Sequence, residues 1–240
     1  MAPGSPTIGA VVPALDEAPA IGAVVRGLRA TGLLDEIVVV DNGSTDGTAR
    51  IAEAAGARAV VEPRRGYGRA CLAGVRALSS DIVLLLDGDA ADDLRDVDRV
   101  LEPLLRGEAD LVVGARTRGV ERGAMTPQQV AGNHIAVTII GALYRCAATD
   151  LGPLRAIRRE HLLRLRMREM TYGWSTEMVV KAARAGYRYR EVAVGYHRRV
   201  GISKVGGNRW GSVRAGGRIL SATVRYAAWR PAADRRLSLA

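Results

Sequence analysis

The sequence predicts an α/β protein: a doubly wound, mostly parallel sheet with helices on both faces, followed by a C-terminal amphipathic helical tail. Continuous branched-aliphatic runs at residues 37–40 and 82–86 are typical of parallel strands that are covered on both faces. Such strand patterns alternate with helical patterns in four or five βα units over about the first 115 residues. Because crossovers of this length are right-handed, they place helices on both faces of the sheet.

The first half of the chain alternates strands and helices. Apolar residues recur at helical spacing within residues 20–30, Gly56 ends a short helix, and Gly107 ends a later helix that Asp92 and Asp93 open. In chain order we expect strand 7–13, helix 20–30, strand 37–40, helix 48–55, strand 58–61, helix 67–78, strand 82–86, helix 92–105 and strand 110–113.

The regular alternation ends after Gly114, where a loop rich in glycine and arginine begins. From Gly206 onward, apolar residues fall on one helical face and arginines on another, which predicts an amphipathic helix. We therefore divide the chain into a globular domain, residues 1–206, and a basic tail, residues 207–240. The other expected elements are helices at 128–147, 159–165 and 176–185 and an alternating strand at 187–194.

The composition sets limits on size, partners and compartment. The chain of 240 residues is 48% hydrophobic, which suffices for one sizeable domain. Its 35 Lys and Arg residues exceed its 25 Asp and Glu residues, and the net charge of +10 suits a nucleic acid, an anionic membrane surface or a phosphorylated substrate. Cys71 and Cys146 have neither metal-ligand nor redox spacing, so we expect no disulfide framework and a reducing cytoplasm.

Any membrane contact is expected to be peripheral. Residues 1–6 lack the basic start and the apolar stretch of a signal peptide. The longest apolar candidate, residues 135–143, is about half of the ~20 residues that a spanning helix needs. We therefore expect a cytoplasmic protein that could also lie against the inner face of the membrane.

Both long apolar strands run directly into aspartates, at residues 41–47 (Asp-Asn-Gly-Ser-Thr-Asp-Gly) and 87–89 (Asp-Gly-Asp). Ligands of open α/β sheets bind beyond the carboxyl ends of the strands, so both acidic loops should share one crevice. Asp87 and Asp89 are two residues apart and point to the same side of an extended chain. Two such carboxylates suit a divalent cation whose shell is completed by water and a nucleotide diphosphate. The alternative is that these aspartates only cap the following helix.

Several segments resemble those of a known family in order and spacing. Residues 13–17, 40–47, 66–74 and 87–89 resemble the motifs of family 2 glycosyltransferases with the GT-A fold. The segments at 113–116, 150–155, 173–178 and 199–204 are similar to the dolichyl- or polyprenyl-phosphate sugar synthase branch, and the resemblance covers residues 7–206. It implies an inverting enzyme that moves a hexose from a UDP- or GDP-linked sugar to polyprenyl phosphate. The alternative is the same donor with a soluble hydroxyl or phosphate acceptor.

The resemblance also implies roles for individual residues. Asp87 and Asp89 would hold Mg²⁺ or Mn²⁺. Asn42 stands where the family usually has a second aspartate, and the arginine that often precedes the Gly132-Asn133 pair is missing. Residues implied to bind the nucleotide-sugar donor are Pro13, Glu17, Asp41, Gly66, Gly68, Asp87, Gly88, Arg199, Ser203 and Lys204. Residues expected to bind the acceptor are Arg116, Arg155 and Trp174, although an aromatic residue at a helix start can also belong to the core.

The acceptor decides whether the enzyme needs a general base. A phosphate monoester has a second pKa near ~6 and can attack the anomeric carbon as a dianion. A hydroxyl acceptor would need a carboxylate within hydrogen-bond reach. Asp150 and Glu177 are the candidates for that base, and Asp89 counts as catalytic through the metal. Alternatively, Asp150 caps a turn, and Glu177 is a helix-surface charge paired with Lys181.

Three interpretations of the tail remain open. Residues 207–230 could lie on anionic lipid, dock onto their own domain, or form an oligomer contact, and the sequence predicts no oligomeric state. A nucleic-acid-binding module is the hypothesis from another class, but no aromatic stacking platform accompanies the charge, so we expect no nucleic-acid partner. A sugar nucleotidyltransferase would open with a glycine-rich basic loop, which residues 13–17 do not provide.

Overall fold

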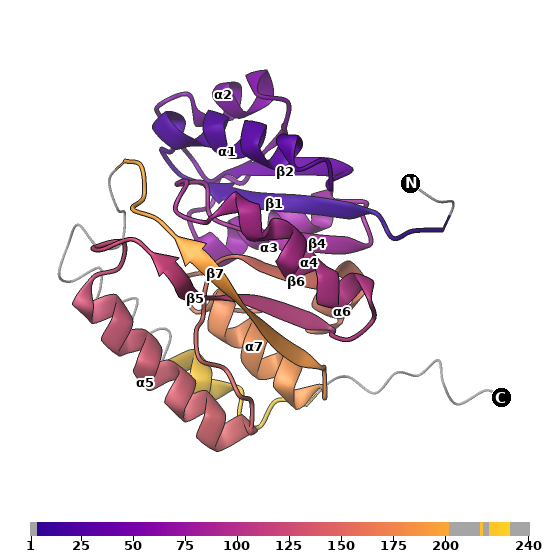
Figure 1. Cartoon of the computed structure of the whole chain (residues 1–240), viewed down its shortest axis with the longest axis vertical. Coiled ribbons are helices and arrows are strands. Elements are labelled where there is room, and N and C mark those ends of the chain that lie inside the picture. The colour runs from indigo at the N-terminus through magenta and orange to yellow at the C-terminus, as the bar shows by residue number, and fades with distance from the viewer. Residues whose placement is uncertain (1–3, 202–216, 218–220, 231–240) are drawn as a thin grey trace.

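The structure, a computed structural model, describes residues 4–201, 217 and 221–230 of the chain. A seven-stranded sheet with the order β3-β2-β1-β4-β6-β5-β7 forms its centre (Figure 1). β6 runs antiparallel to β4 and β5, and the other neighbouring pairs are parallel, which confirms the predicted fold class. The strands are β1 (Ile8–Ala14), β2 (Glu36–Asp41), β3 (Arg58–Val61), β4 (Ile82–Leu85), β5 (Leu111–Val120), β6 (Arg155–Arg158) and β7 (Tyr189–Tyr196).

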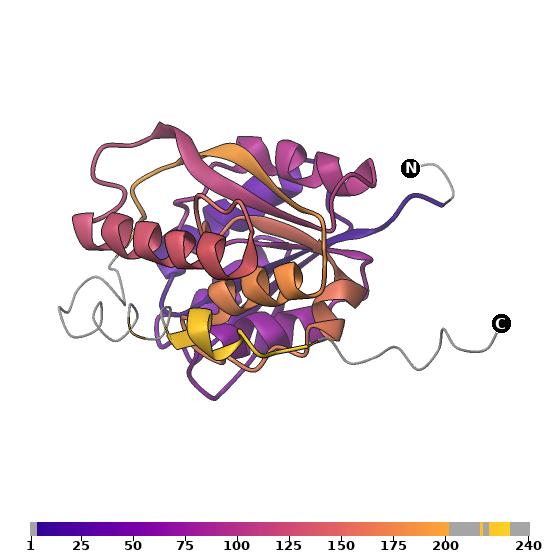
Figure 2. The same cartoon turned by 90° about the horizontal axis from the view of Figure 1, so that it is seen from below.

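Helices cover both faces of the sheet (Figures 1 and 2). Side chains alternate along the buried strands and so supply two cores: Val38 and Val40 of β2 join the core with α3 and α7, whereas Val39 joins the core with α1 and α4. The helices are α1 (Ala18–Ala30), α2 (Thr48–Ala54), α3 (Tyr67–Ala77), the 3₁₀ turn η1 (Leu94–Asp96), α4 (Val97–Leu105), α5 (Pro127–Tyr144), α6 (Arg159–Arg164) and α7 (Trp174–Arg184).

The register of the parallel strands aligns their carboxyl ends. Ala14 of β1 pairs with Asp41 of β2, and Val11 of β1 pairs with Leu85 of β4. The segments that follow these three strands therefore leave the sheet at one edge, as the two aspartate-tipped strands predict.

Three expectations about the elements need correction. The helix expected at 92–105 begins with the 3₁₀ turn η1, because the Asp93 side chain accepts the Arg95 N–H, and α4 starts only at Val97. The strand expected at 110–113 continues to Val120 and pairs with β7 at residues 111–116 and again at Val120, after a shift in register. No strand was expected at β6, whose sequence Arg-Ala-Ile-Arg looks too basic for the position between two buried strands.

Part of the basic tail packs on the domain itself. Thr223 and Tyr226 are buried. The Arg184 Nε donates to the Trp229 carbonyl at 3.0 Å, and the Tyr144 hydroxyl donates to the Thr223 carbonyl. For residues 221–230 these contacts match docking onto the domain, while the rest of the expected tail helix lies outside the described residues, apart from residue 217. Within the described part of the chain, none of the helices has the length and apolar character that crossing a bilayer requires.

Candidate active site

A cavity of about 860 Å³ opens at the edge of the sheet where the parallel strands end. Both acidic loops contribute to it, as the sequence predicts. Of the residues expected to bind ligands, those that line the cavity are Pro13, Glu17, Gly66, Asp87, Gly88, Asp89, Arg116 and Arg199. Those that do not line it are Asp41, Gly68, Asp150, Arg155, Trp174 and Glu177. Ser203 and Lys204 lie outside the described residues.

Asp41 shapes the first acidic loop. Its Oδ1 accepts the N–H groups of Gly43 at 3.1 Å and Ser44 at 2.7 Å, and the side chain is almost fully buried. The Ser44 hydroxyl oxygen in turn accepts the Asp16 N–H at 2.9 Å. The carboxylate of Asp41 therefore closes a turn, and that turn is bound to the segment that follows β1.

Asn42 fixes the loop before α3. Its Nδ2 donates to the carbonyls of Glu62 at 2.8 Å and Arg64 at 2.9 Å, and its Oδ1 accepts the Gly66 N–H at 2.7 Å. An aspartate has no donor for those two carbonyls. Sequence reasoning treated Asn42 only as a departure from the family pattern, because its partners are 20 to 24 residues away along the chain.

Three carboxylates gather after β4: those of Asp89 and Asp92 are buried, and that of Asp87 is partly exposed. The Asp87 N–H donates to Asp92 Oδ2 at 3.2 Å, and the Ala91 N–H donates to Asp89 Oδ1 at 3.0 Å. The Oδ1 atoms of Asp87 and Asp92 are buried and accept no hydrogen bond from the described residues. Burial and the neighbouring Asp89 raise the pKa of Asp87 to about 7, and burial next to Asp87 raises the pKa of Asp92.

A cation would satisfy the unpartnered oxygen of Asp87, which lines the cavity, so the carboxyl oxygens at this position fit a divalent metal ion. Among the residues that the structure describes, no three His, Cys, Asp or Glu side chains form a metal-binding group by themselves. Sequence reasoning assigned Asp92 to helix capping and missed its place beside Asp87.

Arg199 lies between two carboxylates of the cavity. Its Nη2 is 2.6 Å from Glu17 Oε1, and its Nη1 is 3.5 Å from Asp89 Oδ2. The next residue, Val200, donates its N–H to the Asp89 carbonyl at 2.8 Å. The segment after β7 thus lies across the Asp87–Asp89 loop and brings a positive charge to it, as the sequence predicts for Arg199.

Arg116, which lines the cavity, forms a bidentate ion pair with Asp150. The Nε of Arg116 donates to Asp150 Oδ2 at 2.8 Å and its Nη2 donates to Oδ1 at 2.7 Å. The Arg116 N–H also donates to Oδ2, at 2.8 Å. Although burial opposes both shifts, these bonds lower the pKa of Asp150 and raise the pKa of Arg116. Both oxygens of the first candidate base are therefore held by an arginine.

Glu177, the second candidate base, forms the expected i, i+4 pair with Lys181. The prediction that this pair lies on the helix surface is wrong. The two charged atoms are 2.6 Å apart and both side chains are fully buried. Glu177 accepts the N–H groups of Arg168 and Glu169, because its helix faces the chain segment that precedes it. The pair therefore holds that segment and does not face the cavity.

Arg155 and Trp174 lie beneath the cavity. Arg155 is 1% exposed and donates to the carbonyls of Leu151 at 3.0 Å and Ser175 at 3.1 Å. Trp174 is also 1% exposed and belongs to the core, as one of its two interpretations predicts. Both residues support neighbours that line the cavity, including Leu151 and Ser175.

The fold and this cavity agree with a family of enzymes. Residues 10–164 match the sequence profile described as "Glycosyl transferase family 2", and the chain belongs to this family of glycosyltransferases. The resemblance drawn from the motifs is thereby confirmed.

Individual relatives differ in what they act on. The chain is 38% identical over 216 residues to an uncharacterized glycosyltransferase of Mycobacterium tuberculosis, covering 85% of this chain and 92% of the relative. It is 33% identical over 204 residues to a dolichyl-phosphate hexose transferase of Haloferax volcanii, covering 82% and 86%. The crystal structure of glucosyl-3-phosphoglycerate synthase from M. tuberculosis with Mn²⁺, UDP-glucose and phosphoglyceric acid aligns with a TM-score of 0.74 at 25% identity, covering 95% of this chain and 82% of that one.

Proposed function

We propose that this protein is an inverting, metal-dependent hexosyltransferase that uses a UDP- or GDP-linked sugar and transfers the hexose to polyprenyl phosphate. The observation that carries the proposal is that Arg199, which pairs with Glu17 and Asp89, lines one cavity together with both of them and with Asp87, whose Oδ1 has no hydrogen-bond partner among the described residues. It combines a site for a cation with a guanidinium that suits a diphosphate.

The roles that we propose in binding the nucleotide-sugar donor follow from these charges. Asp87 and Asp89 hold Mg²⁺ or Mn²⁺, which when bound neutralises the developing charge of the leaving diphosphate. Arg199 adds positive charge to the same leaving group, with Ser203 and Lys204 as further expected donors. Pro13, Glu17 and the Asp41 turn bind the nucleoside. The relative with UDP-glucose and Mn²⁺ in its crystal structure supports this assignment.

The residues expected at the acceptor side of the cavity favour a phosphate group as the acceptor. Arg116 lines the cavity and remains charged at neutral pH, while Asp150 and Glu177 are both held in ion pairs. A phosphate dianion needs no general base, so it can attack without either carboxylate. Polyprenyl phosphate is supported by the relative that is a dolichyl-phosphate hexose transferase. A soluble phosphate such as phosphoglycerate is the second candidate, supported by the crystal structure that contains it.

A donor and acceptor screen tests the proposal. Purified protein with Mn²⁺ or Mg²⁺ is assayed for hydrolysis of UDP- and GDP-linked glucose and mannose, and then for transfer to polyprenyl phosphate, 3-phosphoglycerate and polyols. We expect transfer to polyprenyl phosphate. Transfer only to 3-phosphoglycerate would establish the second candidate, and transfer only to polyols would contradict a phosphate acceptor.

A matched pair of variants tests the metal site. Asp89→Asn should abolish metal-dependent fluorescence quenching by UDP or GDP, because it removes a charged ligand. Asp98→Asn is the control, since Asp98 is an exposed residue of α4. Equal metal-dependent quenching in both variants would contradict the role of Asp89.

A further inference from the structure

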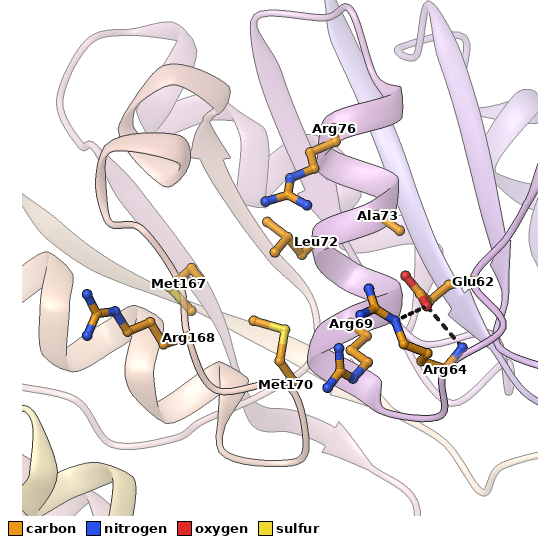
Figure 3. Close-up of a pocket in the computed structure, with 9 residues that line it drawn as sticks. All are labelled: Glu62, Arg64, Arg69, Leu72, Ala73, Arg76, Met167, Arg168 and Met170. Carbon is orange, nitrogen blue, oxygen red and sulfur yellow. Dashed lines mark hydrogen bonds and ion pairs between the residues drawn. The ribbon is translucent and has the colours of Figure 1, made fainter.

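A second cavity, of about 370 Å³, lies between α3 and the segment that precedes α7 (Figure 3). It shares no lining residue with the active-site cavity. Its floor contains apolar side chains from both walls. The residues that line it are Glu62, Arg64, Arg69, Leu72, Ala73, Arg76, Met167, Arg168 and Met170.

The cavity carries a concentrated positive charge. Four arginines and one glutamate line it, and the glutamate, Glu62, is paired with Arg64 at 3.4 Å. The side chains of Arg69, Arg76 and Arg168 form no hydrogen bond or ion pair with the residues that the structure describes. A cleft with one sign of charge concentrates ions of the opposite sign, and guanidinium groups suit phosphate oxygens.

Arg69 and Arg76 are placed to act together. They are seven residues apart on α3, which is about two helical turns, so they lie on one face of the helix. In Figure 3 the Arg76 guanidinium extends over Leu72, Arg69 lies next to Met170, and the Arg168 guanidinium points away from α3. Arg69 and Arg76 are therefore the principal ligands for an anion, and Arg168 adds charge at the opposite wall.

The backbone of both walls is held in place. Asn42 binds the carbonyls of Glu62 and Arg64 on one side. On the other side, Glu177 accepts the Arg168 N–H. The Arg69 N–H donates to the Met170 carbonyl at 3.2 Å and so joins the two walls directly. A preformed cavity loses less entropy when it binds a ligand than a mobile surface does.

The geometry points to a second anion-binding site in this cavity, separate from the active site, for a phosphate or diphosphate group. Its small volume and apolar floor of Leu72, Ala73, Met167 and Met170 fit a phosphorylated small molecule. The same group on a lipid headgroup is the other source of this chemistry.

Calorimetric titration with inorganic pyrophosphate, in metal-free buffer at constant ionic strength, tests the site. We expect Arg69→Gln/Arg76→Gln to weaken binding by at least about tenfold, because two charge-assisted contacts are lost. The matched control Arg26→Gln/Arg106→Gln removes the same charge from α1 and the end of α4 and should bind within about twofold of wild type.

Wild-type affinity in Arg69→Gln/Arg76→Gln would overturn the proposal, and so would an equal loss of binding in the control Arg26→Gln/Arg106→Gln. Arg69→Lys/Arg76→Lys keeps the charge and guards against a folding defect, and it should bind with intermediate affinity. Co-sedimentation with phosphatidate vesicles shows whether the bound phosphate belongs to a small molecule or to a lipid. If the protein binds vesicles but not pyrophosphate, and this binding requires Arg69 and Arg76, the site is assigned to a lipid headgroup. No binding of either probe would refute it.

Discussion

Asn42 shows how one side chain can order a loop. It donates to two carbonyls and accepts one N–H, all within 2.9 Å. An aspartate at this position would place a negative charge against the carbonyls of Glu62 and Arg64. The asparagine at position 42 thus has a structural reason, since this loop requires donors.

We predict that Asn42→Asp lowers the free energy of unfolding by about 1 to 3 kcal/mol, because two partly buried hydrogen bonds to the carbonyls of Glu62 and Arg64 lose their donor. Urea unfolding measures the change. Asn133→Asp is the control, since the Asn133 Nδ2 makes a single long bond of 3.4 Å. A loss at position 42 no greater than at position 133 would contradict the role assigned to Asn42.

From the sequence, only those site residues that directly follow a recognisable strand could be predicted. Asp87 and Asp89 follow a visible strand, and they do line the cavity. The bidentate bonds between Arg116 and Asp150 span 34 residues, so no local pattern indicates them. Arg155 looks like a phosphate ligand in the sequence, yet its guanidinium is used by backbone carbonyls.

At the scale of elements, the strands with long aliphatic runs were predicted well, whereas β6 was missed and β5 was predicted too short. β1, β2 and β4 are buried on both faces, so their sequences are nearly uniform. β6 was missed because arginines stand at both of its ends, and β5 was cut short because its last four residues are exposed. Helix positions were predicted to within a few residues because their apolar faces repeat.

Glu36 joins β2 to the turn before β4. It accepts the N–H and hydroxyl groups of both Ser79 and Ser80, at 2.6 to 3.0 Å. Burial raises the pKa of Glu36, but these hydrogen bonds outweigh burial and lower the pKa from 4.5 to about 2. Since the folded-state pKa is the lower one, the stabilisation is present above about pH 4.5 and is lost as the pH falls toward 2.

We therefore predict that Glu36→Gln costs about 2 kcal/mol of unfolding free energy at pH 7, and that its difference from wild type shrinks between pH 4.5 and 2. Urea unfolding across this pH range tests it. Glu102→Gln, at an exposed pair with Arg106, should show a small difference at every pH. If the difference in unfolding free energy between Glu36→Gln and wild type stayed constant with pH, the assumed link between the Glu36 pKa and stability would be contradicted.

At the scale of the whole molecule, the end of the chain is part of the domain. Tyr226 and Trp229 lie over the Lys181 ammonium, with ring centres 4.7 and 5.1 Å away. Residues 221–230 thereby close one side of the core formed with α7 (Figure 2). The domain boundary at residue 206 stays a prediction from the sequence pattern. Residues 221–230, which follow that boundary, are in contact with the domain.

We predict that a chain ending at Gly207 is less stable than wild type by about 2 to 4 kcal/mol, because Tyr226 and its cation–π contact are lost. Thermal and urea unfolding measure the loss, and a chain ending at Arg230 is the control. Equal stability of the two truncated chains would refute the prediction. Vesicle co-sedimentation of the same proteins tests lipid binding by the tail, and unchanged binding on truncation would exclude it.

The buried pair of Glu177 and Lys181 has a consequence for local opening of the chain. Glu177 accepts the N–H groups of Arg168 and Glu169, and Lys181 donates to the carbonyls of Leu165 and Arg166. These amides lie outside helices and strands, where exchange with solvent deuterium is usually fast. We expect the amides of Arg168 and Glu169 to exchange as slowly as those within α7, because opening them would take hydrogen bonds away from a fully buried carboxylate. Hydrogen–deuterium exchange resolved by residue would measure this protection, and rapid exchange at both amides would contradict it.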